Sequence, residues 1–136
     1  MDSKAVFIDT SFFKALIDSQ DDFYDQANSV WRKLRIARVQ LITSNYIIDE
    51  TATLIRARLG VKIALKFRQT VVNSRQIKIV RVLVADEATA WDWFKKNWSR
   101  LSYTDCICFA QMQRLNISQV CSFDQHFKRA GFSLVA

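Results

Sequence analysis

Apolar residues follow two alternating patterns along the chain. Short runs rich in β-branched residues are typical of strands, and longer segments with apolar residues every three or four positions indicate helices. The runs that predict strands are 5–8, 40–43, 77–82, 119–123 and 132–135. The segments that predict helices are 11–18, 22–37, 44–59, 61–75, 86–96, 104–115 and 125–130. This alternation predicts an α/β fold whose mostly parallel central sheet is flanked by helices.

No part of the sequence resembles a linker between domains. The chain contains no proline, its only glycines are Gly60 and Gly131, and it has no internal repeat. A length of 136 residues suits one hydrophobic core. We expect residues 1–136 to form a single domain, with Gly60 separating two helices of a hairpin.

Composition excludes several kinds of site and compartment. With one histidine, no Cys-x-x-Cys pair and two glycines, the chain cannot form a structural zinc site or a glycine-rich nucleotide loop. The three cysteines, an odd number, are expected to be reduced and buried. No apolar run approaches the ~18 residues of a membrane helix, and the first residues lack the features of a signal peptide. We therefore expect a soluble, cytoplasmic protein.

The charge of the chain favours a polyanionic partner. Lysine and arginine number 20 against 13 acidic residues, which gives a formal net charge of +7. Such a surface attracts nucleic acid through counterion release. The alternative is that the charge only keeps a small protein soluble.

Two aspartates follow predicted strands directly. Asp9 ends the run 5–8 and Asp124 ends the run 119–123, each just before a predicted helix. Ligands of open α/β sheets bind outside the carboxyl ends of the strands, so both positions are candidates for a site. The alternative role of each residue is to cap the following helix.

Helical geometry singles out two further carboxylates. Asp105 shares a helix face with Cys108, Phe109 and Met112, so it is predicted to point inward from the first helical turn. An acid that only interacts favourably with the helix dipole could equally well face solvent. Glu50 borders the apolar stripe of the segment 44–59, whereas Asp49 is predicted to project away from it.

Four carboxylates in one place repel one another, and a divalent cation would offset that repulsion. An all-oxygen ligand set favours Mg²⁺ or Mn²⁺. Such an ion activates a water for attack on a phosphodiester and neutralises the charge that develops on phosphate. Together with the basic surface, the acids Asp9, Glu50, Asp105 and Asp124 predict a metal-dependent enzyme that hydrolyses the phosphodiester bonds of a nucleic acid.

Four motifs in order resemble the PIN-domain ribonucleases, and especially the VapC-like toxins of toxin-antitoxin systems. The motifs are Val6-Phe7-Ile8-Asp9-Thr10-Ser11, Tyr46-Ile47-Ile48-Asp49-Glu50-Thr51, Ser102-Tyr103-Thr104-Asp105-Cys106 and Ser122-Phe123-Asp124-Gln125-His126-Phe127. The resemblance implies a three-layer α/β/α PIN-like domain that cleaves RNA with Mg²⁺ or Mn²⁺ and leaves 5′-phosphate ends. It also implies a homodimer and a small antitoxin that inserts a segment into the acidic cleft.

The same resemblance implies the roles of individual residues. The four acids become catalytic residues and metal ligands, and Ser11 and Thr104 become supporting hydroxyls, although Thr104 could equally cap its helix. His126 stays outside the catalytic set, because a lone histidine on a short helix more often packs or lies at the surface. The basic residues nearest a motif are weaker candidates for RNA contacts, and they are Lys95, Lys96 and Arg100.

Some features stay open at this point. Trp91, Trp93 and Trp98 could stack on bases, but helix-spaced aromatic residues usually belong to the core. Arg58 lies within an apolar stripe without an evident reason. Two rivals remain to the toxin interpretation: an RNA-processing PIN nuclease without an antitoxin, and a non-catalytic module that binds RNA or a partner.

Overall fold

The computed structural model describes residues 5–135. Its strands are β1 (Val6–Ile8), β2 (Leu41–Ser44), β3 (Ile77–Val80), β4 (Gln119–Cys121) and β5 (Ser133–Leu134). Its helices are α1 (Thr10–Ile17), α2 (Tyr24–Ile36), α3 (Asn45–Leu59), α4 (Val61–Asn73), α5 (Val84–Phe94), α6 (Tyr103–Arg114) and α7 (Gln125–Arg129). Residues 1–4, which carry part of the expectation about a signal peptide, lie outside the described residues. In the described part, none of the helices has the length and apolar character needed to cross a membrane.

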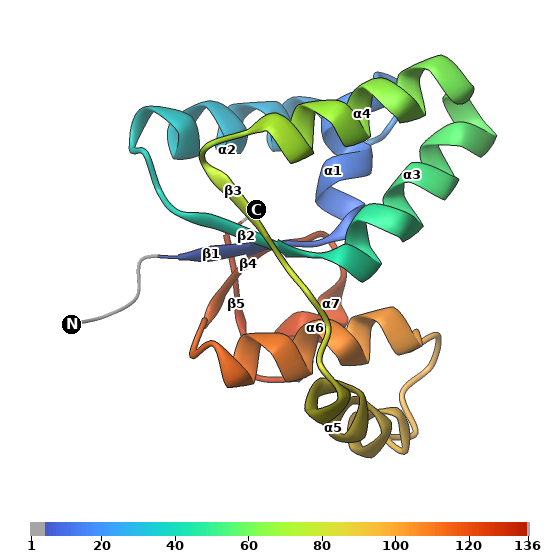
Figure 1. Ribbon diagram of the computed structural model, residues 1–136, viewed down its shortest axis with the longest axis vertical. Coiled ribbons are helices and arrows are strands. Elements are labelled where there is room, and N and C mark those ends of the chain that lie inside the picture. Colours follow the sequence, from blue (N-terminus) through green and yellow to red (C-terminus); the bar gives the residue numbers. More distant parts are fainter. Residues whose placement is uncertain (1–4, 136) are drawn as a thin grey trace.

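The strands form one parallel sheet in the order β3-β2-β1-β4-β5. Helices α1 to α4 cover one face of this sheet and helices α5 to α7 cover the other, as Figure 1 shows. The predicted α/β/α layers and mostly parallel sheet are therefore confirmed. Parallel strands need crossover connections, and every connection in this sheet contains at least one helix.

The centre of the sheet is the point where the direction of winding reverses. The chain moves from β1 outward to β2 and β3, then returns to the other side of β1 to form β4 and β5. Ile8 pairs with Cys121 in the register of β1 and β4, and the backbone N–H of Asp9 donates to the carbonyl of Cys121 (3.1 Å). The residues that follow β1 and β4 are thus brought together at the site where α/β sheets bind ligands.

Helix α6 is buried more completely than its sequence pattern predicts. The pattern places one face inward, but every residue from 105 to 112 is buried. One side of α6 faces the sheet and α5 covers another side (Figure 1). A helical wheel cannot anticipate that second cover, because it contains no information on neighbouring helices.

The helical hairpin predicted around Gly60 is present. Gly60 has a φ of 99° and lies between α3 and α4, which pack against each other. This left-handed region is accessible to glycine without the clash that a Cβ atom would cause. The hairpin fixes the direction of α3, the helix that carries Glu50.

Candidate active site

Asp9 is held at the end of β1 as the N-cap of α1. Its side chain is almost fully buried, with 3% of the residue exposed. The hydroxyls of Ser11 and Ser122 donate to Asp9 Oδ2 at 3.0 and 2.8 Å. These two serines come from opposite ends of the chain, and they fix the carboxylate in one orientation.

Asp105 lies in the first turn of α6 and is 7% exposed. The N-cap of α6 is Ser102, whose Oγ accepts a hydrogen bond from the Asp105 N–H (3.0 Å), while Asp105 Oδ2 accepts one from the Ser102 N–H (3.4 Å). Asp105 therefore points inward, as its helical face predicts. Thr104 does not cap this helix, which removes the alternative role considered for it.

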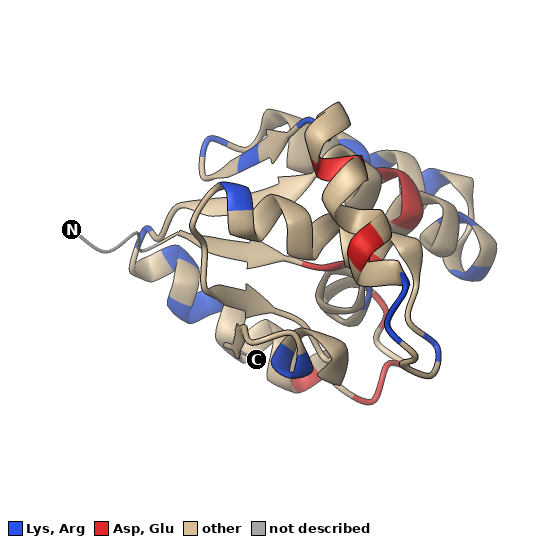
Figure 2. Ribbon diagram, turned by 90° about the horizontal axis from the view of Figure 1, so that it is seen from below, with Lys and Arg blue, Asp and Glu red and all other residues tan. Residues whose placement is uncertain are grey.

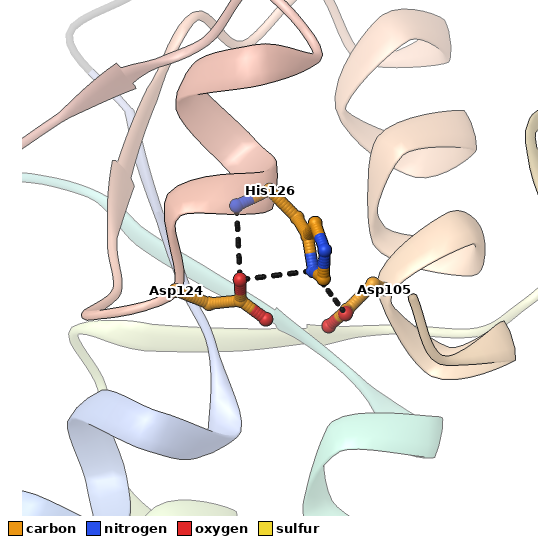
Figure 3. Close-up of side chains that lie close together, drawn as sticks. All are labelled: Asp105, Asp124 and His126. Atoms are coloured by element: carbon orange, nitrogen blue, oxygen red, sulfur yellow. Dashed lines mark hydrogen bonds and ion pairs between the residues drawn. The ribbon is translucent and has the colours of Figure 1, made fainter. Parts of the chain in front are cut away.

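Asp124 and His126 complete a compact group with Asp105. Asp124 is the N-cap of α7 and accepts a hydrogen bond from the His126 N–H (2.9 Å). The His126 Nδ1 atom lies 3.0 Å from Asp124 Oδ1 and 3.6 Å from Asp105 Oδ2. Figure 3 shows the three side chains pointing toward one another from α6 and α7. One ligand atom from each lies within 4.8 Å of the others, which is a spacing that one metal ion could bridge.

The four predicted acids line one cleft of about 500 Å³. Glu50 reaches it from α3, opposite the carboxyl ends of β1 and β4. Figure 2 shows acidic segments gathered around this end of the sheet, whereas basic segments are spread more widely over the helices. Asp49 borders a neighbouring depression together with Glu50, but it does not line the acidic cleft.

Burial and mutual repulsion change the acidity of this cluster. Burial raises the pKa of Asp9 from 3.8 to about 6, against the opposing effect of hydrogen bonds from Ser122 and Ser11. Burial, and then the negative charges of Asp9 and Asp124, raise the pKa of Asp105 to about 8. Without a cation the cleft therefore retains protons that ordinary carboxyl groups release. Such raised values are typical of functional sites.

The comparisons with known proteins agree with this geometry. A family model described as "PIN domain" matches residues 6–133. The chain belongs to the PIN-domain family. It is 30% identical over 128 residues to the "23S rRNA-specific endonuclease VapC20" of two Mycobacterium tuberculosis strains, CDC 1551 / Oshkosh and ATCC 25618 / H37Rv, which covers 93% of this chain and 95% of each relative.

A solved structure of the same relative has the same fold as this PIN domain. The crystal structure of Mycobacterium tuberculosis VapC20, described as a "Sarcin-Ricin loop cleaving toxin", superposes with a TM-score of 0.83 at 29% identity. The match covers 93% of this chain and 95% of that one. The predicted resemblance to VapC-like PIN domains is confirmed.

The residues of the cleft fit a hard divalent cation. Carboxylate oxygens dominate the donor set, and such oxygens are the preferred ligands of Mg²⁺ and Mn²⁺. His126 Nε2 lies 2.8 Å from the carbonyl oxygen of Ser99, so Nε2 carries the hydrogen. The buried Nδ1 atom has no hydrogen-bond partner among the described residues, although it faces two carboxylates. A buried ring nitrogen beside two carboxylates suits a site that gains a cation.

The weaker site predictions have different outcomes in this PIN domain. Ser11 contacts Asp9, as predicted for a supporting hydroxyl, whereas Thr104 lines the neighbouring depression rather than the acidic cleft. Arg100 lines the cleft. Lys95 pairs with Asp92 (3.5 Å), and the Lys96 ammonium lies over the ring of Trp93 at 6.0 Å.

Other open residues are now placed. Trp93 packs on Phe109 and Trp98 stacks on His126, and both are half-buried against the core, whereas Trp91 is 52% exposed. Arg58 is exposed on α3. The pKa of Asp18 is lowered mainly by the hydrogen bond from the Gln20 N–H, then by Lys14, and the positive charge of Arg58 adds a smaller contribution.

Sequence reasoning missed two residues that support the acids. Ser122 donates to Asp9 across 113 positions of sequence, and His126 contacts both Asp105 and Asp124. Both belong to the last PIN-domain motif, so their proximity to Asp124 was a usable signal. The contact of Ser122 with Asp9 follows only from the pairing of β1 with β4. The contact of His126 with Asp105 follows only from the packing of α6 on α7.

Proposed function

We propose that this PIN domain is a metal-dependent endoribonuclease and the toxin of a toxin-antitoxin pair. The observation that carries the proposal is the convergence of four carboxylates from four separate motifs in one cleft, where burial raises the pKa values of two of them, Asp9 and Asp105. Such a cluster is unfavourable by itself and becomes favourable around a cation. The relationship to VapC20, whose name describes an rRNA endonuclease, supports the same reaction.

The residues of the cleft have two proposed roles, as metal ligands and as hydrogen-bond donors that orient those ligands. Asp9, Asp105, Asp124 and Glu50 would hold Mg²⁺ or Mn²⁺, which supplies an acidified water and neutralises phosphate charge when bound. The hydroxyls of Ser11 and Ser122 restrain the side chain of Asp9, and the backbone N–H of Ser102 restrains that of Asp105. Burial of Asp9, Asp105 and Ser122 limits competing water on that side of the reacting phosphate.

Cationic residues at the cleft would bind the RNA backbone. Arg100 lines the cleft in a left-handed backbone conformation, with a φ of 62°. Lys14 also lines it, but its ammonium group is engaged by Asp21 (2.7 Å) and Asp18 (3.3 Å). We therefore assign phosphate contact to Arg100 first. Lys95 and Lys96 are proposed to attract RNA over a longer range through the net charge of +7.

The proposed substrate is a structured RNA with an accessible loop. The solved relative is described as cleaving the sarcin-ricin loop, and this chain matches it over nearly its whole length. An open cleft at the carboxyl ends of the central strands admits a single strand more easily than a regular helix, whose bases are paired. Which RNA this protein cleaves is what end mapping would determine.

The proposed partners follow from the toxin assignment. A small antitoxin would insert a cationic segment into the acidic cleft, where it would relieve the repulsion that a metal otherwise relieves. Homodimer formation is supported by large apolar side chains that are exposed on α4 and α5, including Leu65 (64%) and Val84 (83%). Cytoplasmic action is supported by three free, buried cysteines.

Sequencing of RNA ends tests the function directly. Expression of the wild-type protein should create new RNA 5′-phosphate ends at one or a few positions, and Asp9→Asn should remove them, because an amide is a neutral and weaker metal ligand. An identical set of ends from both proteins would contradict the proposal. A neighbouring reading frame whose product suppresses the cleavage separates a toxin from an RNA-processing enzyme.

A further inference from the structure

An aromatic stack leads from the core to the acidic cleft. Phe12 is fully buried, and its ring centroid lies 6.0 Å from that of Phe123 at an interplanar angle of 20°. Phe123 in turn stacks on Phe23 at 4.3 Å and 7°. Phe23, the last ring of the three, is 44% exposed. Single exposed apolar side chains are common, so it is the place of this ring, at the open end of a stack beside the acids, that distinguishes it.

The segment before Phe23 is held in place by a network of polar contacts. Asp21 Oδ1 accepts the N–H of Phe23 (2.8 Å), and Asp21 Oδ2 binds the ammonium group of Lys14 (2.7 Å). Asp18 Oδ1 accepts the N–H of Gln20 (3.0 Å), and the N–H of Asp21 donates to the carbonyl of Asp18 (2.9 Å). The ring is therefore fixed before any ligand arrives, which lowers the entropy lost on binding.

Phe23 and Phe123 line the same cleft as the four acids. One face of the Phe23 ring is covered by Phe123, so its exposed surface is available to a planar group entering the cleft. The cleft is crowded with carboxylates and would repel an anionic group that is not paired with a cation. A neutral, flat aromatic group meets no such repulsion.

We propose that Phe23 is a stacking platform for an unpaired RNA base next to the phosphate held at the acids. The proposal rests on the proposed ribonuclease function and adds the base as a second recognised element of the substrate. Aromatic stacking is tolerant of base identity and contributes about 10-fold or more to the affinity per base. The stack would orient the strand, while Arg100 and a bound cation hold its backbone.

The chain offers a closely matched control for this residue. Phe94, at the end of α5, is also a phenylalanine and is 43% exposed, but it packs on Trp91 and Tyr103 and does not line the cleft. Replacing either residue with leucine keeps an apolar side chain and removes the aromatic face. Because the two residues match in type and exposure, a difference between the two variants reports the effect of position in the cleft.

Binding of single-stranded RNA to the cleavage-deficient Glu50→Gln protein in the presence of Mn²⁺, measured by fluorescence anisotropy with a labelled 12-nucleotide oligoadenylate, tests the proposal. Added to this variant, Phe23→Leu should weaken binding by about 10-fold, whereas Phe94→Leu should leave it unchanged and Phe23→Trp should retain or strengthen it. Inorganic polyphosphate, which has charges but no bases, should bind all four proteins alike.

Three results would overturn the proposal: unchanged oligoadenylate affinity in Phe23→Leu, an equal loss in Phe94→Leu, or an equal loss of polyphosphate binding in Phe23→Leu. The last result would assign Phe23 to the shape of the cleft rather than to a base. Failure of the ribonuclease function would be recognised separately, because expression of the wild-type protein would then create no new RNA ends. A thermal melt of each variant confirms that the compared proteins are folded.

Discussion

Replacing Glu50 with glutamine is expected to abolish RNA cleavage, whereas replacing its neighbour Asp49 with asparagine is expected to leave cleavage intact. Both residues are exposed on α3, but only Glu50 lines the cleft with Asp9, Asp105 and Asp124. Removing one preorganised charged group from an active site lowers the rate by about 10² or more. The loss for Glu50→Gln should be of that size.

The two substitutions are matched in nearly every other respect. Each is almost isosteric, each removes one negative charge from the same helix, and neither changes helix propensity greatly. Single-turnover cleavage of an RNA substrate with both variants and the wild type measures the effect of position alone. Wild-type activity in Glu50→Gln, or inactivity in a folded Asp49→Asn protein, would show that the cleft acts through a different set of acids.

The metal-free protein is expected to lose stability as the pH rises from about 4 to about 8. In the native state the pKa of Asp9 is about 6 and that of Asp105 about 8, whereas the ordinary value for an unfolded aspartate is 3.8. Between these values the native state holds protons that the unfolded state has released, so the free energy of unfolding falls with pH. For Asp9 alone the raised pKa corresponds to about 3 kcal/mol.

Asp105→Asn should flatten this dependence and stabilise the metal-free protein at pH 8. The amide keeps an oxygen that can accept from the Ser102 N–H but carries no charge to repel Asp9 and Asp124. Denaturant unfolding in EDTA at pH 5 and pH 8 measures both effects. If the variant were clearly less stable than the wild type at pH 8, the capping bonds of Asp105 would outweigh the repulsion, and the acids would not be strained without a cation.

Much of this fold can be predicted from the sequence because apolar residues recur at the spacing typical of a strand or of a helix in each element. All of the predicted strands and helices occur in the predicted order, with ends displaced by a few residues. The displacements have local causes. For example, α5 begins two residues earlier than predicted, at Val84, because Asp86 Oδ2 accepts the N–H of Leu83 (2.9 Å) and is held by Arg114 (2.9 Å).

The acids could be predicted individually because each has a local reason for its position. Asp9 and Asp124 follow strands, and Asp105 lies on an apolar helix face. The alternative capping roles were also correct for Asp9 and Asp124, since both are N-caps. Capping and lining a cleft are compatible here, because the N-termini of α1 and α7 themselves meet at the site and favour negative charge there.

The contacts of His126 and the exposure of Phe23 could not be predicted in the same way. The contacts of His126 depend on how α7 packs beside α6, and the exposure of Phe23 depends on a stack with Phe123, which lies 100 positions later in the sequence. A periodic pattern describes one element in isolation and does not say which element faces it. The supporting residues of a site are therefore harder to predict than the charged residues themselves.

Isothermal titration with Mn²⁺ at neutral pH tests the central claim, that the acidic cleft holds a divalent cation. The wild-type protein should bind Mn²⁺, Asp105→Asn should lose most of that affinity, and Asp49→Asn should bind as the wild type does, because only Asp105 belongs to the compact group with Asp124 and His126. Equal Mn²⁺ affinity in the wild-type and Asp105→Asn proteins would contradict the claim.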